Sequence, residues 1–291
     1  MALLQQIING LSLGSIYALI ALGYTMVYGI IKLINFAHGD IYMIGAFIGL
    51  YCGKNLGLSL LPTLIISMIG AALCGVIIEK VAYKPLRNSQ RITLLITAIG
   101  ISLLLENGMK LAVGSSPKAF PKLLSTEVIK LGRLSLETSK ILMLVVSIML
   151  VVFLQFIVFK TKIGKAMRAA SYDIEAASLM GINVNNIISI TFAIGSALAG
   201  AAGVLVSLAF KVVEPYMGMI PGLKGFIAAV LGGIGSIPGA LIGGLLIGLT
   251  ETLTKAYIST ILSDAIVFAI LIIILLVKPS GLLGIKINEK V

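Results

Sequence analysis

The sequence predicts an all-α, polytopic integral membrane protein with about eight transmembrane segments, some of them discontinuous or re-entrant. Of its 291 residues, 59% are hydrophobic and only 11% are charged, whereas soluble domains carry about 25% charged residues. The mean hydropathy is +1.12, and long runs without any charged residue recur along the chain. No stretch is polar enough for a separate soluble domain, so residues 1–291 are expected to form a single transmembrane domain.

The uncharged runs define the expected elements in order: 1–31, 41–53, 55–78, 92–105, 141–159, 176–210, 225–250 and 265–277. The run 92–105 is expected to continue past Glu106, and the last run to begin upstream of Asp264. As a helix, 41–53 would measure about 20 Å, which is too short to cross about 30 Å of hydrocarbon. The region 35–53 is therefore predicted to hold a half-helix or a re-entrant segment.

The stretch LINFAHGDIYMIGAF, residues 33–47, places the single histidine, His38, beside Asn35 and Asp40 at the start of this short helix. Asn35 and Asp40 are expected to cap the free amides of its first turn, and Asp40 to favour its positive end. His38 then needs no catalytic role, because packing of the break accounts for it.

A second break is predicted near 225–250, where the glycines and Pro238 of LGGIGSIPGALIGG, residues 231–244, interrupt an apolar run. Three unbroken crossings after residue 170 would put the basic tail on the opposite side from segment 160–175, whereas two short helices meeting at the break restore an even count. The layouts of 35–47 and 234–246 are alike, which leaves an internal repeat as an open alternative.

The distribution of Lys and Arg indicates the orientation. Connections 79–91 and 160–175 lie on one side and together carry eight basic residues: Lys80, Lys84, Arg87, Arg91, Lys160, Lys162, Lys165 and Arg168. The opposite loop, 114–140, carries five: Lys118, Lys122, Lys130, Arg133 and Lys140. Eight against five favours cytoplasmic connections and an extracytoplasmic loop 114–140. The net charge of +11 fits this bias and contact with anionic membrane lipid, and no aromatic-basic interleaving indicates nucleic acid.

The sequence carries no arrangement typical of an enzyme. The patterns GxxxxGK[ST], GxSxG and HExxH are absent, and one histidine cannot build a His-rich metal site. Cys52 and Cys74 both lie in apolar runs without CxxC spacing, and we interpret them as small buried apolar residues. The chain is therefore predicted to be no enzyme and to bind no metal or cofactor itself.

Ionisable residues within apolar runs are expected to neutralise one another. Glu106 and Lys110, like Glu251 and Lys255, are four residues apart and can pair on one helix face. Asp264 has no such neighbour and is expected to be interfacial or paired across helices. Gly235, Gly239 and Gly243 recur every four residues, as in a helix-packing stripe, although a glycine-lined passage remains an alternative.

Segment GKAMRAASYDIEAASLMGINV, residues 164–184, interleaves charged, hydroxyl and apolar residues at helical spacing. One face would carry Met167, Ala170, Ile174, Ala177, Leu179 and Met180. Gly181 would end the helix as a C′ glycine. Two interpretations stay open for 161–185, a solvated connecting helix and a helix that docks into the groove of a partner.

Three blocks of sequence resemble one family. EAASLMG, residues 175–181, fits the E-A-A-x-x-x-G pattern of the permease subunits of bacterial ABC importers, and the fuller RAASYDIEAASLMGINV resembles the branched-chain amino acid permeases. Residues 10–47 and 229–251 resemble the N-terminal and late glycine-rich regions of the same family. The sequence is most similar to the LivH-type member of the LivH/LivM permease pair. It departs from the general importer motif where Gly181 is not followed by I-x-L-P.

The resemblance implies one subunit of a larger importer in the bacterial cytoplasmic (inner) membrane. The partners would be a second, LivM-type permease, two cytoplasmic subunits that bind ATP and Mg²⁺, and a periplasmic or lipoprotein substrate-binding protein. Leucine, isoleucine or valine would move inward by alternating access. The implied ATPase-coupling residues are Arg168, Ser171, Asp173, Glu175, Ala176, Ala177 and Gly181. Residues considered for the translocation path are Asn35, His38, Asp40, Glu106, Gly232, Gly233 and Gly235.

Two alternatives remain beside this interpretation. A permease of the same broad group could carry urea or short amides, because no residue pattern here can be tied to a branched aliphatic side chain. An ATP-independent channel or secondary carrier would also have broken helices and membrane-embedded carboxylates, but it would have no need of the EAAxxxG segment. A membrane-embedded enzyme is the least favoured class, since no catalytic cluster exists.

Overall fold

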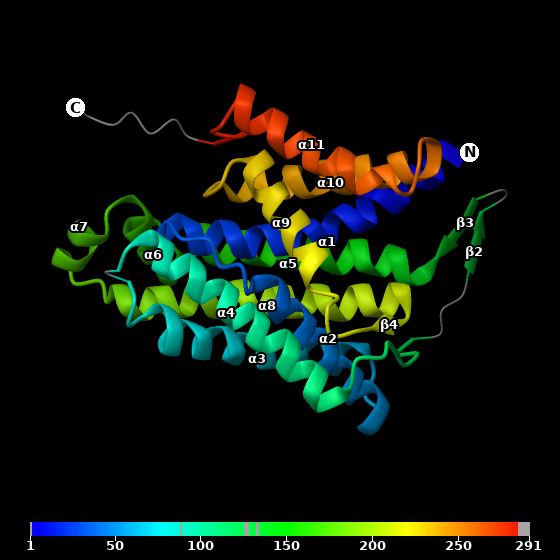
Figure 1. The fold of residues 1–291 in the computed structure, drawn as a ribbon, viewed down its shortest axis with the longest axis horizontal. Helices are drawn as coiled ribbons and strands as arrows, with labels where there is room; N and C mark the ends of the chain where they lie inside the picture. The colour runs from blue at the N-terminus through cyan, green and yellow to red at the C-terminus, as the bar shows by residue number, and fades with distance from the viewer. Residues whose placement is uncertain (1, 88, 125–127, 132–133, 285–291) are drawn as a thin grey trace.

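The computed structural model describes residues 2–87, 89–124, 128–131 and 134–284, so Arg133, Lys286 and Lys290 lie outside the described residues. The chain forms an elongated bundle of helices, with α6 and α7 at one end and the β2–β3 hairpin at the other (Figure 1). This architecture confirms the predicted all-α polytopic membrane fold.

The helices are α1 (Ala2–Ile31), α2 (His38–Asn55), α3 (Leu60–Ile78), α4 (Arg91–Val113), α5 (Thr138–Lys160), α6 (Lys162–Tyr172), α7 (Ile174–Leu179), α8 (Val184–Phe210), α9 (Met219–Gly232), α10 (Ile237–Tyr257) and α11 (Leu262–Val277). A π-helical turn, η1 (Glu79–Tyr83), extends α3. Two antiparallel pairs of short strands add β1 (Lys118–Ala119) to β4 (Val212–Val213) and β2 (Val128–Leu131) to β3 (Leu134–Glu137).

Six described helices are long and apolar enough to cross a membrane: α1, α3 with η1, α4, α5, α8 and α10. Their burial divides them into a core and a periphery. In α1 and α8, 83% and 72% of the apolar window is buried, against 17% in α4. The core helices therefore face protein, whereas α4 presents apolar residues outward, to lipid or to another chain.

Small residues let the core helices approach closely. A Cβ atom on Gly14 of α1 would lie 2.8 Å from the Cα of Leu245 in α10, and one on Gly244 would lie 2.4 Å from the backbone nitrogen of Ala18. Gly45 of α2 meets Gly200 of α8 in the same way. Because lipid tails are as apolar as leucine, such backbone contact replaces the hydrophobic effect as a source of helix association in membranes.

The first break in the bundle runs from Lys32 to Ala37. Lys32 has a left-handed backbone (φ +56°) and ends α1, and α2 begins at His38 without any side-chain cap. The expected side-chain cap from Asn35 is wrong, because its Oδ1 accepts a 2.8 Å hydrogen bond from the Tyr83 hydroxyl instead. The backbone carbonyl of Asn35 accepts from the His38 N–H (3.0 Å). Asp40 lies in the first turn, as expected.

The second break lies upstream of its predicted position. Lys211, also left-handed (φ +61°), ends α8, and the chain reaches α9 through β4 and Gly218. Within 225–250, residues 233–236 form a tight turn in which Gly233 and Gly235 have φ of +103° and +96°. The run is thus divided as predicted, but the expectation of two short helices is wrong for α10. Pro238 does not interrupt α10, because it sits in the first turn, where proline is tolerated. With 21 residues, α10 is long and apolar enough to cross a membrane.

The two breaks relate the halves of the chain as inverted repeats. The order α1, break, α2, α3, α4 matches the order α8, break, α9, α10, α11. In each half the left-handed lysine precedes a glycine by seven residues, Lys32 to Gly39 and Lys211 to Gly218. From the interior α2 runs toward the hairpin end and α9 toward the α6 end (Figure 1). The open question of a repeat is answered with a different pairing, since 32–39 corresponds to 211–218 rather than to 234–246.

Gly39 and Gly218 meet where the two half-helices begin. A Cβ atom on Gly39 would lie 2.5 Å from the carbonyl oxygen of Gly218, and one on Gly218 would lie 2.2 Å from that of Gly39. Gly222, one turn into α9, approaches the Cα of Gly39 as well. The starts of both half-helices are therefore in direct backbone contact inside the bundle.

The basic connections lie at one end of the bundle, as the sequence predicts. Arg87, after η1, donates a 2.6 Å hydrogen bond to Asn185, and Ser189 donates one of 2.6 Å to Glu79. The described part of the tail reaches the same end, where the Leu282 N–H donates to the carbonyl of Leu231. The even number of passages after residue 170 comes from α8, α9, α10 and α11. Which end faces the cytoplasm remains a prediction from the Lys and Arg count.

We expect Gly39→Ala to destabilise the protein by about 1–3 kcal/mol or more, because the added methyl group would overlap a backbone oxygen that cannot move aside. Gly100→Ala is the matched control, since nothing lies within 4 Å of a Cβ at this helical position, where alanine favours the helix. Thermal unfolding of the two purified variants in detergent measures the difference. Equal unfolding midpoints would contradict the inferred contact.

Candidate functional site

The segment between α5 and α8 is built from two short helices. The Thr161 hydroxyl caps α6 by accepting from the Gly164 N–H (3.1 Å), and the Asp173 carboxylate caps α7 by accepting from the Ala176 N–H (2.9 Å). Gly181 ends the segment with φ +83°, as predicted. The expected single apolar face is wrong, because the chain turns at Asp173. Met167, Ala170 and Ala177 are buried, whereas Leu179 and Met180 are 88% and 84% exposed.

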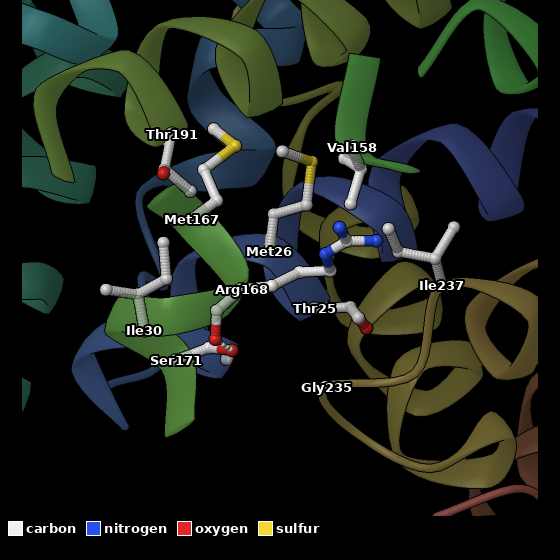
Figure 2. A pocket seen from close by; sticks show the side chains of 11 residues that line it. Thr25, Met26, Ile30, Val158, Met167, Arg168, Ser171, Thr191, Gly235 and Ile237 are labelled. Atoms are coloured by element: carbon white, nitrogen blue, oxygen red, sulfur yellow. Dashed lines mark hydrogen bonds between the residues drawn. The ribbon is translucent and has the colours of Figure 1, made fainter. Parts of the chain in front are cut away.

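Beneath α6 lies a cavity of about 80 Å³, which we call the α6 cavity. Figure 2 shows Arg168 and Ser171 of α6 facing Thr25 and Met26 of α1, with Gly235 from the α9–α10 turn at the edge. The Arg168 guanidinium lies 5.3 Å from the centre of the Phe159 ring. The structure thus brings together two of the expected coupling residues and one of the expected path residues. The remaining polar coupling residues, Asp173 and Glu175, are exposed on the segment.

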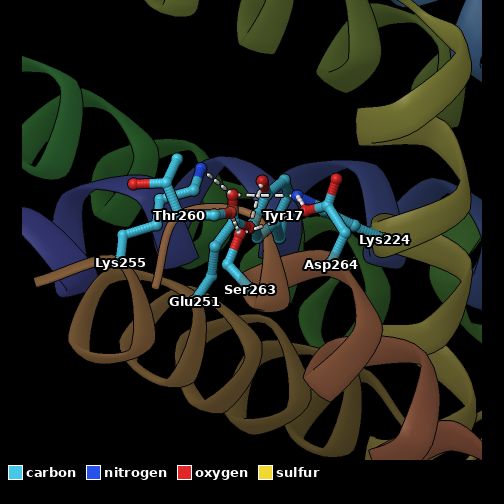
Figure 3. A network of polar contacts seen from close by, with 7 residues as sticks. All are labelled: Tyr17, Lys224, Glu251, Lys255, Thr260, Ser263 and Asp264. Carbon is cyan, nitrogen blue, oxygen red and sulfur yellow. Dashed lines mark hydrogen bonds and ion pairs between the residues drawn. The ribbon is translucent and has the colours of Figure 1, made fainter. Parts of the chain in front are cut away.

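An ionic network centred on the buried Lys224 and Glu251 joins α1, α9, α10 and α11 (Figure 3). Lys224, only 3% exposed, lies 2.8 Å from Glu251 and 2.7 Å from Asp264. Glu251 also accepts from Lys255 (2.5 Å) and from the Tyr17 hydroxyl (2.7 Å). The predicted Glu251–Lys255 pair and the cross-helix partner of Asp264 are both confirmed. Lys224 and Tyr17 are unexpected members of this network, although Lys224 stands out in the sequence as the single charged residue between 215 and 250.

Two further polar contacts hold the first break in place. The fully buried carboxylate of Glu79 forms an ion pair with Arg87 and accepts from Ser189 of α8. Tyr83, four residues on, donates to Asn35. Asn35, considered for the path, is therefore engaged in fixing the break against η1.

A larger cavity of about 310 Å³, which we call the half-helix cavity, lies where α2 and α9 begin. α4 covers it with Ser102 and Glu106, and the carboxyl group of Asp40 interacts with both. The expected pairing of Glu106 with Lys110 is wrong: Glu106 is turned inward whereas Lys110 is exposed, and the ion pairs of the described residues do not include the two. Two expected path residues, far apart in sequence, thus meet in one cavity.

The other expected path residues pack against protein. His38 is buried, its ring lies edge-on to Tyr24 with 4.9 Å between centroids, and it fills the notch left by Gly23. Gly232 packs against Gly239, and Gly233 against Gly284. Gly235 lies outside α10, so the expected helical stripe reduces to Gly239 and Gly243, which pack on α9. Among the described residues, no group of three His, Cys, Asp or Glu could hold a metal ion.

Comparison with known proteins identifies similar chains along nearly the whole length. The family described as "Branched-chain amino acid transport system / permease component" matches residues 6–275. The chain is 43% identical to the high-affinity branched-chain amino acid transport system permease protein BraD of Pseudomonas aeruginosa, over 99% of this chain and 98% of that protein. It is 45% and 44% identical to the corresponding LivH proteins of Salmonella typhimurium and Escherichia coli, each over 99% of this chain and 97% of the relative.

We expect Lys224→Met to lower the free energy of unfolding by about 3–5 kcal/mol, because it removes the buried cation from the buried Glu251 and leaves that carboxylate with the partly exposed Lys255 alone. Adding Glu251→Gln should recover part of the loss. Lys140→Met, which removes the half-exposed pair with Glu137, is the control and should change stability by at most about 1 kcal/mol. Thermal unfolding in detergent compares the three variants. A loss no larger than that of the control would contradict the network's role.

Proposed function

The chain belongs to the family of permease components of branched-chain amino acid transport systems, and on that basis we propose that it is the LivH-type membrane subunit of a bacterial importer for leucine, isoleucine and valine. The near full-length identity to the BraD and LivH relatives is the observation that carries this proposal. The importer would lie in the bacterial cytoplasmic membrane and move its substrate inward by alternating access.

ATP and Mg²⁺ would bind to two separate cytoplasmic subunits, and α6 with α7 would be their docking element. The support is an unusual surface on this segment. Tyr172, Leu179 and Met180 are large and almost fully exposed, and the carboxylates of Asp173 and Glu175 lie beside them. A short helix that presents apolar residues rimmed by charges suits insertion into a groove of a partner protein.

The α6 cavity suggests how a movement of this segment would reach the membrane interior. α6 packs against α1, and the turn between α9 and α10 lines the same cavity through Gly235. α1 leads directly into the first break and α2, and the turn leads back along α9. A displacement of α6 driven by the ATPases would therefore be transmitted to both half-helices, α2 and α9. Arg168 and Ser171 would transmit it from inside the cavity, and Gly181 would fix the far end of the segment.

The second, LivM-type permease would pack against the apolar periphery of the bundle. Large exposed apolar side chains cover α3, α4, α5 and α11, among them Leu61, Leu73, Leu104, Leu111, Phe153 and Leu276. Lipid would cover the part of this surface that the partner leaves free. A periplasmic or lipoprotein substrate-binding protein would dock at the end of the bundle that carries loop 114–140.

We expect Glu175→Lys to abolish substrate-stimulated ATP hydrolysis in the reconstituted importer while the protein still assembles in the membrane, because the charge reversal falls on the docking surface. Glu175→Asp, which keeps the charge at the same exposed position, is the matched control and should preserve coupling. ATPase assays in proteoliposomes with the substrate-loaded binding protein provide the measurement. Unchanged stimulation in Glu175→Lys would refute the coupling role.

Competition experiments test the substrate. Unlabelled leucine should suppress uptake of labelled valine by the complete importer, and urea should not. Suppression by urea would favour the alternative of a permease for urea or short amides, and uptake without ATP would favour a channel or a secondary carrier.

A further inference from the structure

The half-helix cavity combines three features of a ligand-binding site. It lies between the first turns of α2 and α9 and the inner face of α4, and its volume of about 310 Å³ falls at the small end of the range of ligand sites. The breaks on both sides are held by contacts outside the cavity, through Asn35, Tyr83 and Lys224. Asp40 and Glu106, inside the cavity, take no part in these contacts.

Asp40 is the first of these groups. Its side chain is only 2% exposed, and its Oδ2 atom has no hydrogen-bond partner. It lines the cavity together with Glu106, so two carboxyl groups face the same space. Among the described residues no Lys, Arg or His forms an ion pair with either one. Burying a carboxylate without a cation costs free energy, and a positively charged group of a ligand would offset that cost by pairing with it.

The start of α9 is the second group. No acidic residue occupies its first turn and no side chain caps it, whereas α2 carries Asp40 in its own first turn. The positive end of α9 is thus uncompensated where it meets the cavity at Gly218, Met219 and Gly222. Gly218 and Gly222 also pack against Gly39, which holds this end of α9 beside the start of α2. Half-helix ends of this kind hold carboxylates in other transporters.

The rest of the wall is apolar. Phe36, Leu95, Ile99, Leu103 and Leu223 line the cavity between the two polar ends. A ligand with an ammonium group, a carboxylate and a short aliphatic side chain would match all three regions at once. Urea and short amides lack both charged groups and would leave Asp40 without a cation.

We propose that the half-helix cavity is a binding site for a zwitterionic aliphatic amino acid, with the ammonium group on Asp40 beside Glu106 and the carboxylate at the start of α9. The inference rests on the proposed function and adds the place and polarity of substrate binding within this one chain. The aliphatic side chain would lie against the inner face of α4.

The first test measures ligand protection in the purified complete importer without its binding protein. Leucine should raise the thermal unfolding midpoint, whereas isoamylamine, which lacks the carboxylate, and 4-methylpentanoate, which lacks the ammonium group, should not. Asp40→Asn keeps the size of the side chain but removes its charge, and it should abolish the leucine-induced shift. It should also lower leucine uptake into proteoliposomes by about ten- to a hundredfold.

A second pair of variants tests the cavity without touching its charges. Leu103→Trp should fill the space and block uptake and protection, whereas Leu104→Trp, at the neighbouring position that does not line the cavity, should leave both unchanged. Because both leucines are more than half exposed on α4, either variant should fold. This pair decides the question even if Asp40→Asn fails to assemble.

Several outcomes would overturn the inference. If Asp40→Asn loses uptake but retains the full leucine-induced shift, the carboxylate serves an inorganic cation rather than the substrate. If the unaltered importer takes up leucine and both Asp40→Asn and Leu103→Trp do so equally well, this inference alone fails. If the unaltered importer carries urea and not leucine, the proposed function fails, and the inference with it.

Discussion

The contact between Gly39 and Gly218 joins the starts of two half-helices in the interior of the bundle, and the arrangement around it depends on that contact. A chain that interrupts a helix within a membrane frees backbone amides and carbonyls that lipid cannot satisfy. Such breaks persist only where protein or a polar cavity surrounds them. Gly39 and Gly218, which have no side chains, let the two breaks pack against one another.

The buried charges of the bundle follow from the same constraint. α9, with 14 residues, is too short to cross a membrane. Lys224 anchors it to α10 and α11 through ion pairs with Glu251 and Asp264. Together with Lys255, this network sets two positive against two negative charges, so its net charge is close to zero. Tyr17 ties the same network to α1. On the other half-helix Asn35, Tyr83 and Glu79 perform the equivalent work with hydrogen bonds and one ion pair.

The inverted repeat connects these local features to transport. Because α2 and α9 run in opposite directions from one point, a shift of either toward its own end would open the cavity to one side of the membrane. The α6 cavity lies at the junction of α1 with the α9–α10 turn, where a partner acting on α6 and α7 would reach both halves together.

Hydropathy alone determined the class of this protein, the position of nearly every helix and the existence of two interrupted regions, because lipid imposes length and composition on each span. The motif at 175–181 indicated the family, and the spacing of Glu251 and Lys255 predicted their pairing. The tertiary structure decided the rest. Asn35 bonds to Tyr83 instead of capping α2, Glu106 turns to Asp40 instead of Lys110, and the second break falls before α9. These features depend on contacts between segments that are distant along the chain. Local periodicity does not indicate which distant residue will form the stronger hydrogen bond or packing contact.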